Sequence, residues 1–150
     1  IYVPKMIEFY LGEKPILNNI ETWSCGDTKK IKFILENLHD LVIKEVHGSG
    51  GYGMLIGPKS TKKEIINFKK KIMNNPKNYI AQPTLKLSSA PTVIKGKISE
   101  RHVDLRPFCL SGKDTYITQG GLTRVAMKEN SLVVNSSQGG GVKDTWVLTG

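Results

Sequence analysis

Cysteine is scarce in this sequence of 150 residues, and its scarcity excludes two classes of small protein. Only Cys25 and Cys109 occur, far apart and without a CxxC motif or a cluster of cysteine and histidine. A disulfide framework or a structural zinc site needs more such residues at short spacing. We therefore expect neither, and we expect a cytoplasmic location, where thiols stay reduced.

Long apolar runs are also missing. The longest, such as residues 41–43 and 132–134, have the length of a β-strand, whereas a membrane-spanning helix needs about 20 residues. With 39% hydrophobic and 23% charged residues, the composition is that of a folded globular protein and not of a disordered chain. The sequence starts at Ile1 and not at a Met, and it shows no signal-peptide pattern, so we expect a part of a longer polypeptide. A membrane is not expected as a partner.

Acidic residues are fewer than basic ones, 13 against 22, which gives a net charge of +9. This excess suits a phosphate-bearing or polyanionic partner. Much of it lies near residues 29–32 and on a predicted helix within 62–72, where a solvated helix face explains it equally well. Aromatic residues make up only 7% and are not interleaved with the basic clusters, which argues against nucleic acid as the partner.

The first half of the chain predicts helices and strands in alternation. One helix is expected from a cap at residues 27–28 to about residue 39, and another from a capping box at 60–64 to about residue 75. Strands are expected at 41–46, 54–57 and 79–82, with the first two forming a hairpin around a glycine-rich tip. Residues 10–19 are expected to be irregular with a short strand.

The second half predicts a meander of antiparallel strands at 103–110, 115–118, 123–127 and 132–134. The change from alternating helices and strands to strands alone predicts a lobe boundary between residues 83 and 97. We therefore predict an α+β fold of two lobes, 1–83 and 84–150, with mostly antiparallel sheets and flanking helices.

A lysine on a strand beside a glycine-rich tip forms the first candidate site. Glycines let backbone N–H groups approach phosphate oxygens, and Lys44 supplies a charge to the same phosphates. The pattern is neither a Walker motif nor a dinucleotide fingerprint. A flexible turn beside a solvated lysine remains the alternative. The tip consists of Gly48, Ser49, Gly50, Gly51, Tyr52 and Gly53.

The second candidate site is the segment RHVDLRPF at 101–108. Strand alternation places His102, Asp104 and Arg106 on one face. A carboxylate beside cationic side chains suits a Mg²⁺ ligand next to bound phosphate, and a surface ion pair is the alternative. We give His102 no catalytic part.

The third candidate is a polar, glycine-rich segment after residue 134. Asn135 offers a neutral oxygen to a metal, and the glycine amides can serve an anion. A flexible polar loop is the alternative. The phosphate or substrate loop would comprise Ser136, Ser137, Gln138, Gly139, Gly140 and Gly141.

Four blocks in this order resemble the circularly permuted ATP-grasp type 2 proteins. They are VIKEVHGSGGYGM at 42–54, RHVDLRPF at 101–108, GGLTRVA at 120–126 and VNSSQGGGVKDTWVL at 134–148. Members of this family are bacterial proteins of several hundred residues, so the chain resembles their C-terminal part. ATP-grasp enzymes hold ATP and Mg²⁺ between two lobes and join a carboxylate to an amine through an acyl-phosphate.

The resemblance implies a part for each candidate residue. Lys44 and the glycine-rich tip would hold the phosphates of ATP, and residues 80–82, which are Ile80, Ala81 and Gln82, would form the hinge that contacts adenine. Asp104 and Asn135 would be magnesium ligands. Arg106 and Arg124 would stabilise the phosphoryl group during transfer.

Two departures from the family pattern accompany this resemblance. Gln82 stands where many members carry an acid, and Val133 stands where many carry a metal-binding Glu. The carboxylate and amine substrates are unspecified, and the N-terminal remainder of the polypeptide would contribute to binding them. A non-catalytic module that binds a nucleotide or a polyanion is the second hypothesis.

Overall fold

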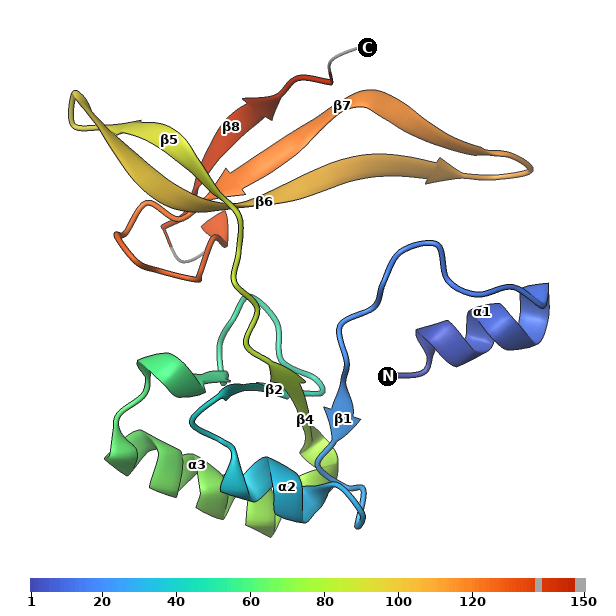
Figure 1. The fold of residues 1–150 in the computed structure, drawn as a ribbon, viewed down its shortest axis with the longest axis vertical. Coiled ribbons are helices and arrows are strands. Elements are labelled where there is room, and N and C mark those ends of the chain that lie inside the picture. Colours follow the sequence, from blue (N-terminus) through green and yellow to red (C-terminus); the bar gives the residue numbers. More distant parts are fainter. Residues whose placement is uncertain (137–138, 148–150) are drawn as a thin grey trace. The chain divides into compact units, whose positions relative to one another are not determined.

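The computed structural model describes residues 1–136 and 139–147. The chain divides into two compact units, Ile1–Leu85 and Lys86–Gly150. Each unit contains one antiparallel four-stranded sheet (Figure 1). The two sheets, with helices in the first unit, confirm the predicted α+β fold. None of the helices in the described part of the chain combines the length and apolar character needed to cross a bilayer.

The sheet of the first unit has the strand order β1-β4-β2-β3. Its strands are β1 (Trp23–Ser24), β2 (Leu41–Glu45), β3 (Leu55–Ile56) and β4 (Tyr79–Pro83). Ile43 of β2 lies opposite Ala81 on one side and Leu55 on the other. The predicted hairpin of β2 and β3 is therefore confirmed, and β4 is an inner strand paired on both edges.

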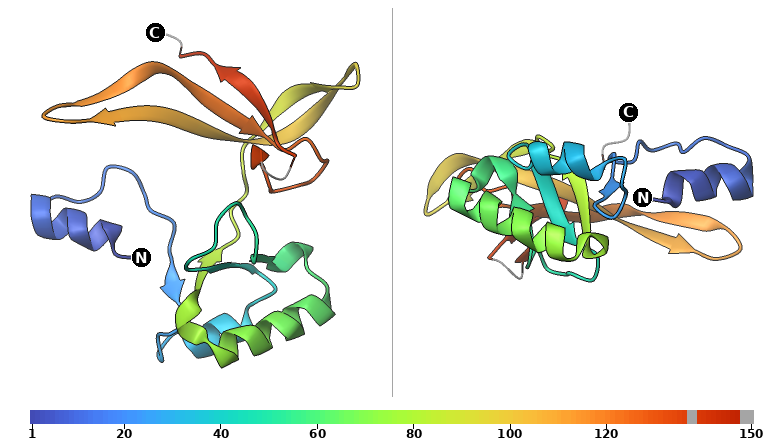
Figure 2. Two further views of the ribbon diagram at one scale, coloured as in Figure 1. Left: turned by 180° about the vertical axis from the view of Figure 1, so that it is seen from behind. Right: turned by 90° about the horizontal axis from the view of Figure 1, so that it is seen from below.

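Two helices lie against the same face of this sheet, as Figure 2 shows from below. They are α2 (Ile31–Glu36) and α3 (Lys62–Asn74), and the short 3₁₀ turns η1 (Gly57–Lys59) and η2 (Pro76–Asn78) flank α3. The predicted capping box starts α3: the Glu64 N–H donates to Thr61 Oγ1, and the Thr61 N–H donates to Glu64 Oε2. Both bonds satisfy backbone N–H groups that the first turn of the helix leaves unpaired.

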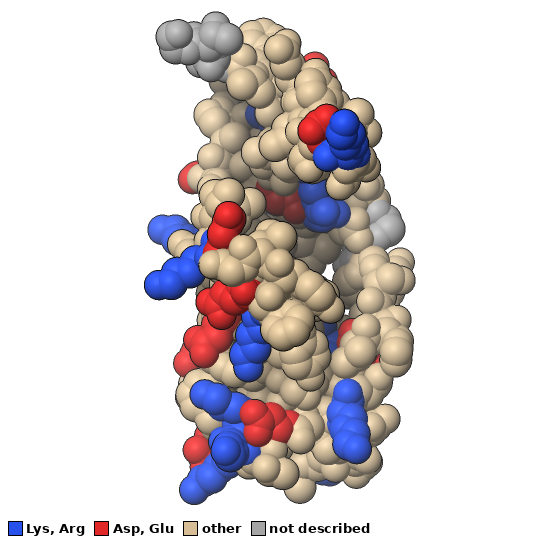
Figure 3. Space-filling model, turned by 90° about the vertical axis from the view of Figure 1, so that its right-hand side faces the viewer, with Lys and Arg blue, Asp and Glu red and all other residues tan. Residues whose placement is uncertain are grey.

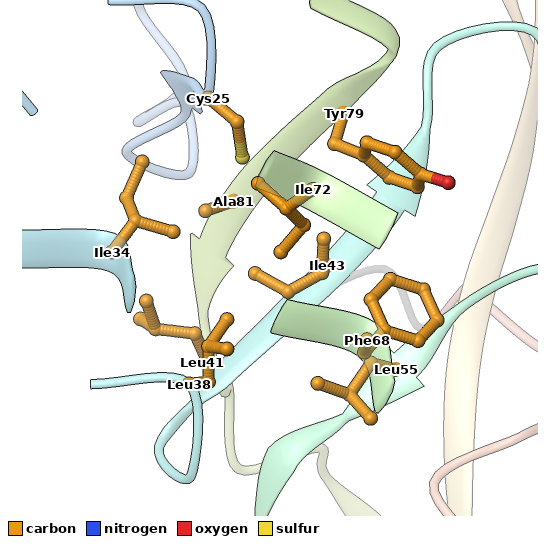
Figure 4. Packing of buried hydrophobic residues seen from close by; sticks show 10 residues of the cluster. All are labelled: Cys25, Ile34, Leu38, Leu41, Ile43, Leu55, Phe68, Ile72, Tyr79 and Ala81. Carbon is orange, nitrogen blue, oxygen red and sulfur yellow. The ribbon is translucent and has the colours of Figure 1, made fainter. Parts of the chain in front are cut away.

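A cluster of buried apolar side chains joins these helices to the sheet (Figure 4). Ile34 comes from α2, Phe68 and Ile72 come from α3, and the alternate residues of β2 and β4 point toward them. Removal of this apolar surface from water is the main force that holds the unit together. The cluster comprises Cys25, Ile34, Leu38, Leu41, Ile43, Leu55, Phe68, Ile72, Tyr79 and Ala81.

Helix α1 (Val3–Leu11) was not predicted, and it overlaps the segment 10–19 only at residues 10–11. Residues 12–19 are irregular as expected, but the short strand expected there is absent. Pro4 in the first turn and Gly12, whose φ of 66° ends the helix, are typical boundary residues. The apolar residues Val3, Met6, Ile7, Tyr10 and Leu11 have helical spacing, although the helix buries none of them, so the sequence carried a signal for α1 that was not used. Helix α2 is also shorter than predicted, because Asp27 closes a turn with the Lys29 N–H before the helix begins.

The second unit is an antiparallel meander of β5 (Ser89–Ile94), β6 (Lys97–Ser111), β7 (Thr115–Val125) and β8 (Gly141–Thr145). The predicted strands 115–118 and 123–127 are parts of the single strand β7, and β5 and β8 were not predicted. Residues 132–134 form no strand. Val134 is buried there without pairing, so the apolar run reflects burial and not a β-ladder.

Candidate functional site

Lys44 projects from β2 into a short chain of hydrogen bonds in the first unit. Its Nζ donates to Gln82 Oε1 at 2.6 Å, and Gln82 Nε2 donates to Thr22 Oγ1 at 2.8 Å. The register of β2 against β4, with Val42 opposite Gln82, brings the lysine and the glutamine together. Two of the three residues in this series of hydrogen bonds, Lys44 and Gln82, were predicted from the sequence as site residues.

The ammonium group of Lys44 has a neutral acceptor and, within the described residues, no carboxylate within ion-pair distance. Partial burial lowers the pKa of Lys44 from its ordinary value, because the charged form loses solvation. A phosphate oxygen would supply the missing negative charge. The lysine is therefore well suited to an anionic ligand.

The glycine-rich tip is separated from the end of β2 by two residues and turns through residues with left-handed backbone. Gly50, Gly51 and Gly53 have φ of 66°, 79° and 67°, which other residues adopt only with strain. A Cβ on Gly53 would lie 3.0 Å from the Glu45 carboxyl carbon. The Gly48 N–H donates to Glu45 O, and the Tyr52 N–H donates to Ser49 O. The tip is thus a compact turn made possible by its glycines.

Residues 80–82 lie within β4. Ile80 and Ala81 pair with β1 and β2 at once, and Ala81 is fully buried in the apolar cluster. Gln82 is the member of this predicted hinge whose side chain takes part in the Lys44 chain. The β4 strand therefore fixes the position of Gln82 through pairing on both of its edges.

In the second unit, three predicted residues meet in one polar network. Arg124 on β7 lies opposite Asp104 on β6. Its Nε donates to Asp104 Oδ1 at 2.9 Å, and its Nη2 donates to Asp104 Oδ2 at 2.5 Å. Its Nη1 donates to Asn135 Oδ1 at 3.0 Å. One guanidinium thus joins the carboxylate and the amide that the sequence predicted as metal ligands.

Arg106 also contacts this network, since its Nε lies 3.5 Å from Asp104 Oδ2. The hydrogen bonds from Arg124 lower the pKa of Asp104 below its ordinary value, although partial burial opposes them. The same bonds raise the pKa of Arg124. Asp104 is therefore a carboxylate at neutral pH, surrounded by two cationic side chains.

The loop after Asn135 uses part of its backbone internally. The Gly139 N–H donates to Ser136 O, and the Gly140 N–H donates to Asn135 O. Gly141 begins β8 opposite Val125. Ser137 and Gln138, which the sequence assigned to the phosphate or substrate loop, lie outside the described residues.

Two oxygen atoms of this network belong to the donor types that Mg²⁺ prefers. The carboxylate of Asp104 and the amide oxygen of Asn135 already converge on a single cationic group, and both are oxygen donors of the kind that Mg²⁺ prefers. A carboxylate has about four lone-pair sites, so Asp104 can serve a metal while it accepts from Arg124. Val133 offers no side-chain donor, and no group of three His, Cys, Asp or Glu side chains gathers within 1–136 and 139–147. Phosphate oxygens and water would complete such a shell.

Comparison with known proteins identifies the family. Residues 1–126 match the model of the family described as circularly permuted ATP-grasp type 2. The chain belongs to this family. The match contains three of the four sequence blocks, at 42–54, 101–108 and 120–126, and the block at 134–148 lies beyond it. The circularly permuted ATP-grasp assignment also agrees with the two antiparallel sheets of the fold.

Several longer bacterial proteins are similar to this ATP-grasp chain over nearly all of its length. An uncharacterized protein of Synechocystis sp. is 52% identical over 99% of the chain, which covers 31% of that relative. One of Mycobacterium leprae is 51% identical over 98% of the chain, covering 26% of that relative. A Frankia casuarinae protein with the name "Putative glutamate--cysteine ligase 2-2" is 42% identical over 97% of the chain, covering 17% of it. The chain thus spans less than a third of these relatives.

Two residues near the candidate sites escaped the sequence analysis. Thr22 accepts a hydrogen bond from Gln82 because β1 pairs with β4, and no local sequence pattern indicates that pairing. Arg101 is only 9% exposed on β6. It shares a strand face with Val103 and Leu105, but Leu105 is 59% exposed, so strand alternation does not indicate the burial of Arg101.

Proposed function

We propose that the protein containing this chain is an ATP- and magnesium-dependent ligase that joins a carboxylate to an amine through an acyl-phosphate. The observation that carries the proposal is the network of Asp104, Arg124 and Asn135, a set of charged and oxygen-donor groups suited to phosphoryl transfer. Membership of the ATP-grasp family and the name of the Frankia relative support a ligase-type function. The wider polypeptide would supply the remaining substrate contacts.

Lys44 would hold the phosphates of ATP, because among residues 1–136 and 139–147 its ammonium group donates to the neutral side chain of Gln82 and pairs with no carboxylate. The glycine-rich tip would close over those phosphates. Residues 80–82 would contact adenine, and Gln82 would act there in place of the acid found in many members. Closure excludes water, which would otherwise hydrolyse the acyl-phosphate before the amine attacks.

Asp104 and Asn135 would hold Mg²⁺ beside the phosphates, and the bound ion would neutralise phosphate charge. Arg124 would keep Asp104 oriented and, with Arg106, would stabilise the negative charge of the transferring phosphoryl group. The carboxylate substrate attacks the γ-phosphorus and ADP leaves. The amine then attacks the carbonyl carbon and phosphate leaves, so no nucleophilic side chain of the protein is required.

The charge distribution gives less support to a non-catalytic module that binds a polyanion. The net charge of +9 motivates that alternative. On the face drawn in Figure 3, however, acidic side chains lie among the basic ones. Salt-sensitive binding of single-stranded nucleic acid that ATP does not compete with would favour the alternative.

Calorimetric titration of the full-length protein with MgATP tests the proposal. Lys44→Ala and Asp104→Ala each remove a charged contact, and a hydrogen bond to a charged group contributes about 1.5–3 kcal/mol. We therefore expect each to weaken MgATP binding roughly tenfold to a hundredfold. Lys62→Ala, which removes an exposed lysine at the start of α3, is the matched control and should bind as the unaltered protein does.

Absence of heat with the unaltered protein at millimolar MgATP would contradict nucleotide binding. Unaltered affinity in both variants would contradict the assignment of these residues. A thermal melt of each variant separates loss of binding from loss of fold. Detection of ADP release that depends on added carboxylate and amine would then test the ligase reaction itself.

A further inference from the structure

The hydrogen bonds that start at Lys44 run in one direction and end on the main chain before β1. Lys44 Nζ donates to Gln82 Oε1, and Gln82 Nε2 donates to Thr22 Oγ1. Thr22 Oγ1 in turn donates to Ile20 O at 2.9 Å. A threonine hydroxyl carries a single proton, and the Ile20 carbonyl accepts it. Toward Gln82 the Thr22 oxygen can therefore only accept, so it must face the NH₂ end of the Gln82 amide.

These three side chains lie on the face of the first sheet that points away from the apolar cluster. Ile43 on β2 and Ala81 on β4 point into that cluster, so their neighbours Lys44 and Gln82 point to the opposite face. Strand β1 pairs with β4 (Figure 1), and their register, continued by one residue, sets Thr22 opposite Gln82. Strand pairing thus places the Thr22 hydroxyl beside the Gln82 amide, on the face that the helices leave open.

The Gln82 amide has two possible orientations, and Thr22 favours one of them. With its NH₂ group on Thr22, the amide presents Oε1 to the Lys44 ammonium, which can only donate. In the reverse orientation the NH₂ group would face the ammonium, and Oε1 would face a hydroxyl oxygen whose proton is already used. Both hydrogen bonds of the amide would then be lost. The observed orientation is therefore the one that both neighbours of Gln82 require.

Thr22 becomes the decisive restraint when Lys44 turns toward a ligand. The ammonium pairs with no carboxylate of the described residues, so an anionic ligand competes for it against the neutral Gln82 alone. Gln82 would then keep one of its two partners. The Thr22 hydroxyl, itself fixed by the Ile20 carbonyl, would hold the NH₂ group and keep Oε1 pointing toward the ligand. A carboxamide held in this way offers a ligand an acceptor and not a donor.

We propose that Thr22 is a positioning residue of the nucleotide site: its hydroxyl fixes the Gln82 amide so that Oε1 faces Lys44 and the base of a bound nucleotide. Thr22 touches no ligand in this arrangement and acts through Gln82. Its effect on a nucleotide rests on the proposed function, because that function assigns residues 80–82 to the base. The orientation of the amide itself needs no nucleotide, so the two can be tested separately.

NMR relaxation of glutamine side-chain amides in the full-length protein without nucleotide tests the orientation. Gln82→Glu removes one amide signal and so assigns it. We expect this amide to be rigid in the unaltered protein. Thr22→Val keeps the branched shape and strand preference of threonine but cannot accept a hydrogen bond, so the Gln82 amide should become mobile. Thr22→Ser retains a hydroxyl and should leave the amide rigid. Thr22→Ala, which also lacks the hydroxyl, replaces Thr22→Val if that variant does not fold.

Calorimetric titration with two nucleotides tests the consequence for binding. ATP carries an amino group on its base where inosine triphosphate carries a carbonyl oxygen, and both are used with Mg²⁺. We expect Thr22→Val to weaken ATP binding about fivefold, the effect of one neutral hydrogen bond, and to reduce the preference for ATP over inosine triphosphate. Thr22→Ser should retain both properties. Thr28→Val alters an exposed threonine before α2, so it is the matched control and should bind ATP as the unaltered protein does.

A rigid Gln82 amide in folded Thr22→Val would overturn the part assigned to Thr22. Equal losses of affinity for the two nucleotides would also overturn it, because a merely structural defect weakens both alike. If the unaltered protein binds no MgATP, the ligase proposal fails, and the NMR comparison still decides the orientation of the amide. If MgATP binds and Thr22→Val changes neither affinity, the ligase proposal stands and the part assigned to Thr22 is refuted.

Discussion

The two units of this chain are stabilised in different ways. The first unit has a ten-residue apolar cluster in which helices α2 and α3 pack on one face of a sheet. The second unit buries Val125, Ala126 and Val134 as its apolar residues, together with the polar Thr92 and Arg101. Where apolar burial is sparse, the strand ladder and side-chain hydrogen bonds must contribute a larger share of the stability.

The second unit also leaves large apolar side chains in contact with solvent. Ile98 and Trp146 are 78% and 84% exposed, and Leu105, Phe108 and Leu110 are all more than half exposed. Exposed apolar groups add little to the folding of the unit that carries them. A substitution in the first unit should therefore change stability through apolar packing, and a substitution in the second unit should change it through charge.

Ile72→Ala is expected to have the largest effect on stability. Ile72 on α3 is fully buried, and its truncation removes apolar contacts and leaves a cavity, at a cost of about 2–5 kcal/mol. Urea unfolding followed by Trp23 fluorescence measures the change, because Trp23 packs against the apolar cluster. Ile66→Ala, on the same helix but 56% exposed, is the control and should change stability by less than about 0.5 kcal/mol. Similar losses in both variants would contradict the packing argument.

Asp104→Asn is expected to have an intermediate effect. It removes the carboxylate from the half-buried Arg124 guanidinium, and an unpaired charged group of this kind costs about 1–3 kcal/mol. The unfolding midpoint in urea measures the loss. Asp40→Asn is the control: its contact with His39 is mostly exposed and should contribute almost nothing. A loss in Asp40→Asn as large as in Asp104→Asn would remove the distinction.

Thr61→Ala is expected to cost about 1 kcal/mol, because it removes the hydroxyl that caps α3. The thermal unfolding midpoint of the first unit reports this loss. Thr61→Ser retains an oxygen able to accept from the Glu64 N–H and should preserve most of the stability. If serine proved as harmful as alanine, the capping bond would not be the cause.

The smallest expected effect is a dependence of stability on acid. The folded-state pKa of Asp104 lies below its ordinary value of 3.8, so its contribution is present above that value and is lost as the pH falls through the folded-state pKa. Urea titrations between pH 5 and about pH 2.5 measure this loss. Asp104→Asn should lose less stability over this range than the unaltered chain, and equal losses would contradict the linkage.

Much of the first unit could be predicted because its residues encode local structure. The capping box of Thr61 and Glu64 and the apolar spacing of Phe68 and Ile72 fix α3 within the sequence itself. The glycine-rich tip likewise marks the β2–β3 hairpin. By contrast, α1 was not predicted although its apolar residues Val3, Met6, Ile7 and Tyr10 have helical spacing, and the helix buries none of them.

The second unit was harder to predict because its strands are selected by pairing. β8 consists of a glycine followed by mostly polar residues, and it is a strand because β7 offers it an edge. The apolar run 132–134 looked like the better strand but is not paired. Propensity is a weak guide where tertiary pairing decides the outcome.

In the candidate sites, too, residue types could be predicted from the sequence, whereas contacts that depend on strand pairing could not. The residue types of Asp104, Arg124 and Asn135 were readable from the sequence. The register of β6 and β7 brings Asp104 and Arg124 together, and Asn135, which lies outside any strand, reaches the same guanidinium. That a single guanidinium links both oxygen donors depends on β7 lying beside β6. The contact of Thr22 with Gln82 depends on strand pairing, which no short motif records.

The polar network of Asp104, Arg124 and Asn135 also depends on Gly140, a residue without a side chain. Its N–H donates to Asn135 O, and a Cβ placed on it would lie only 2.3 Å from Val134 O. Replacing one hydrogen by a methyl group would therefore force residues 134–135 apart from the turn and carry the Asn135 amide away from Arg124. A harmful variant at this position would leave every proposed ligand-binding side chain chemically intact, so its defect would be traced to geometry alone.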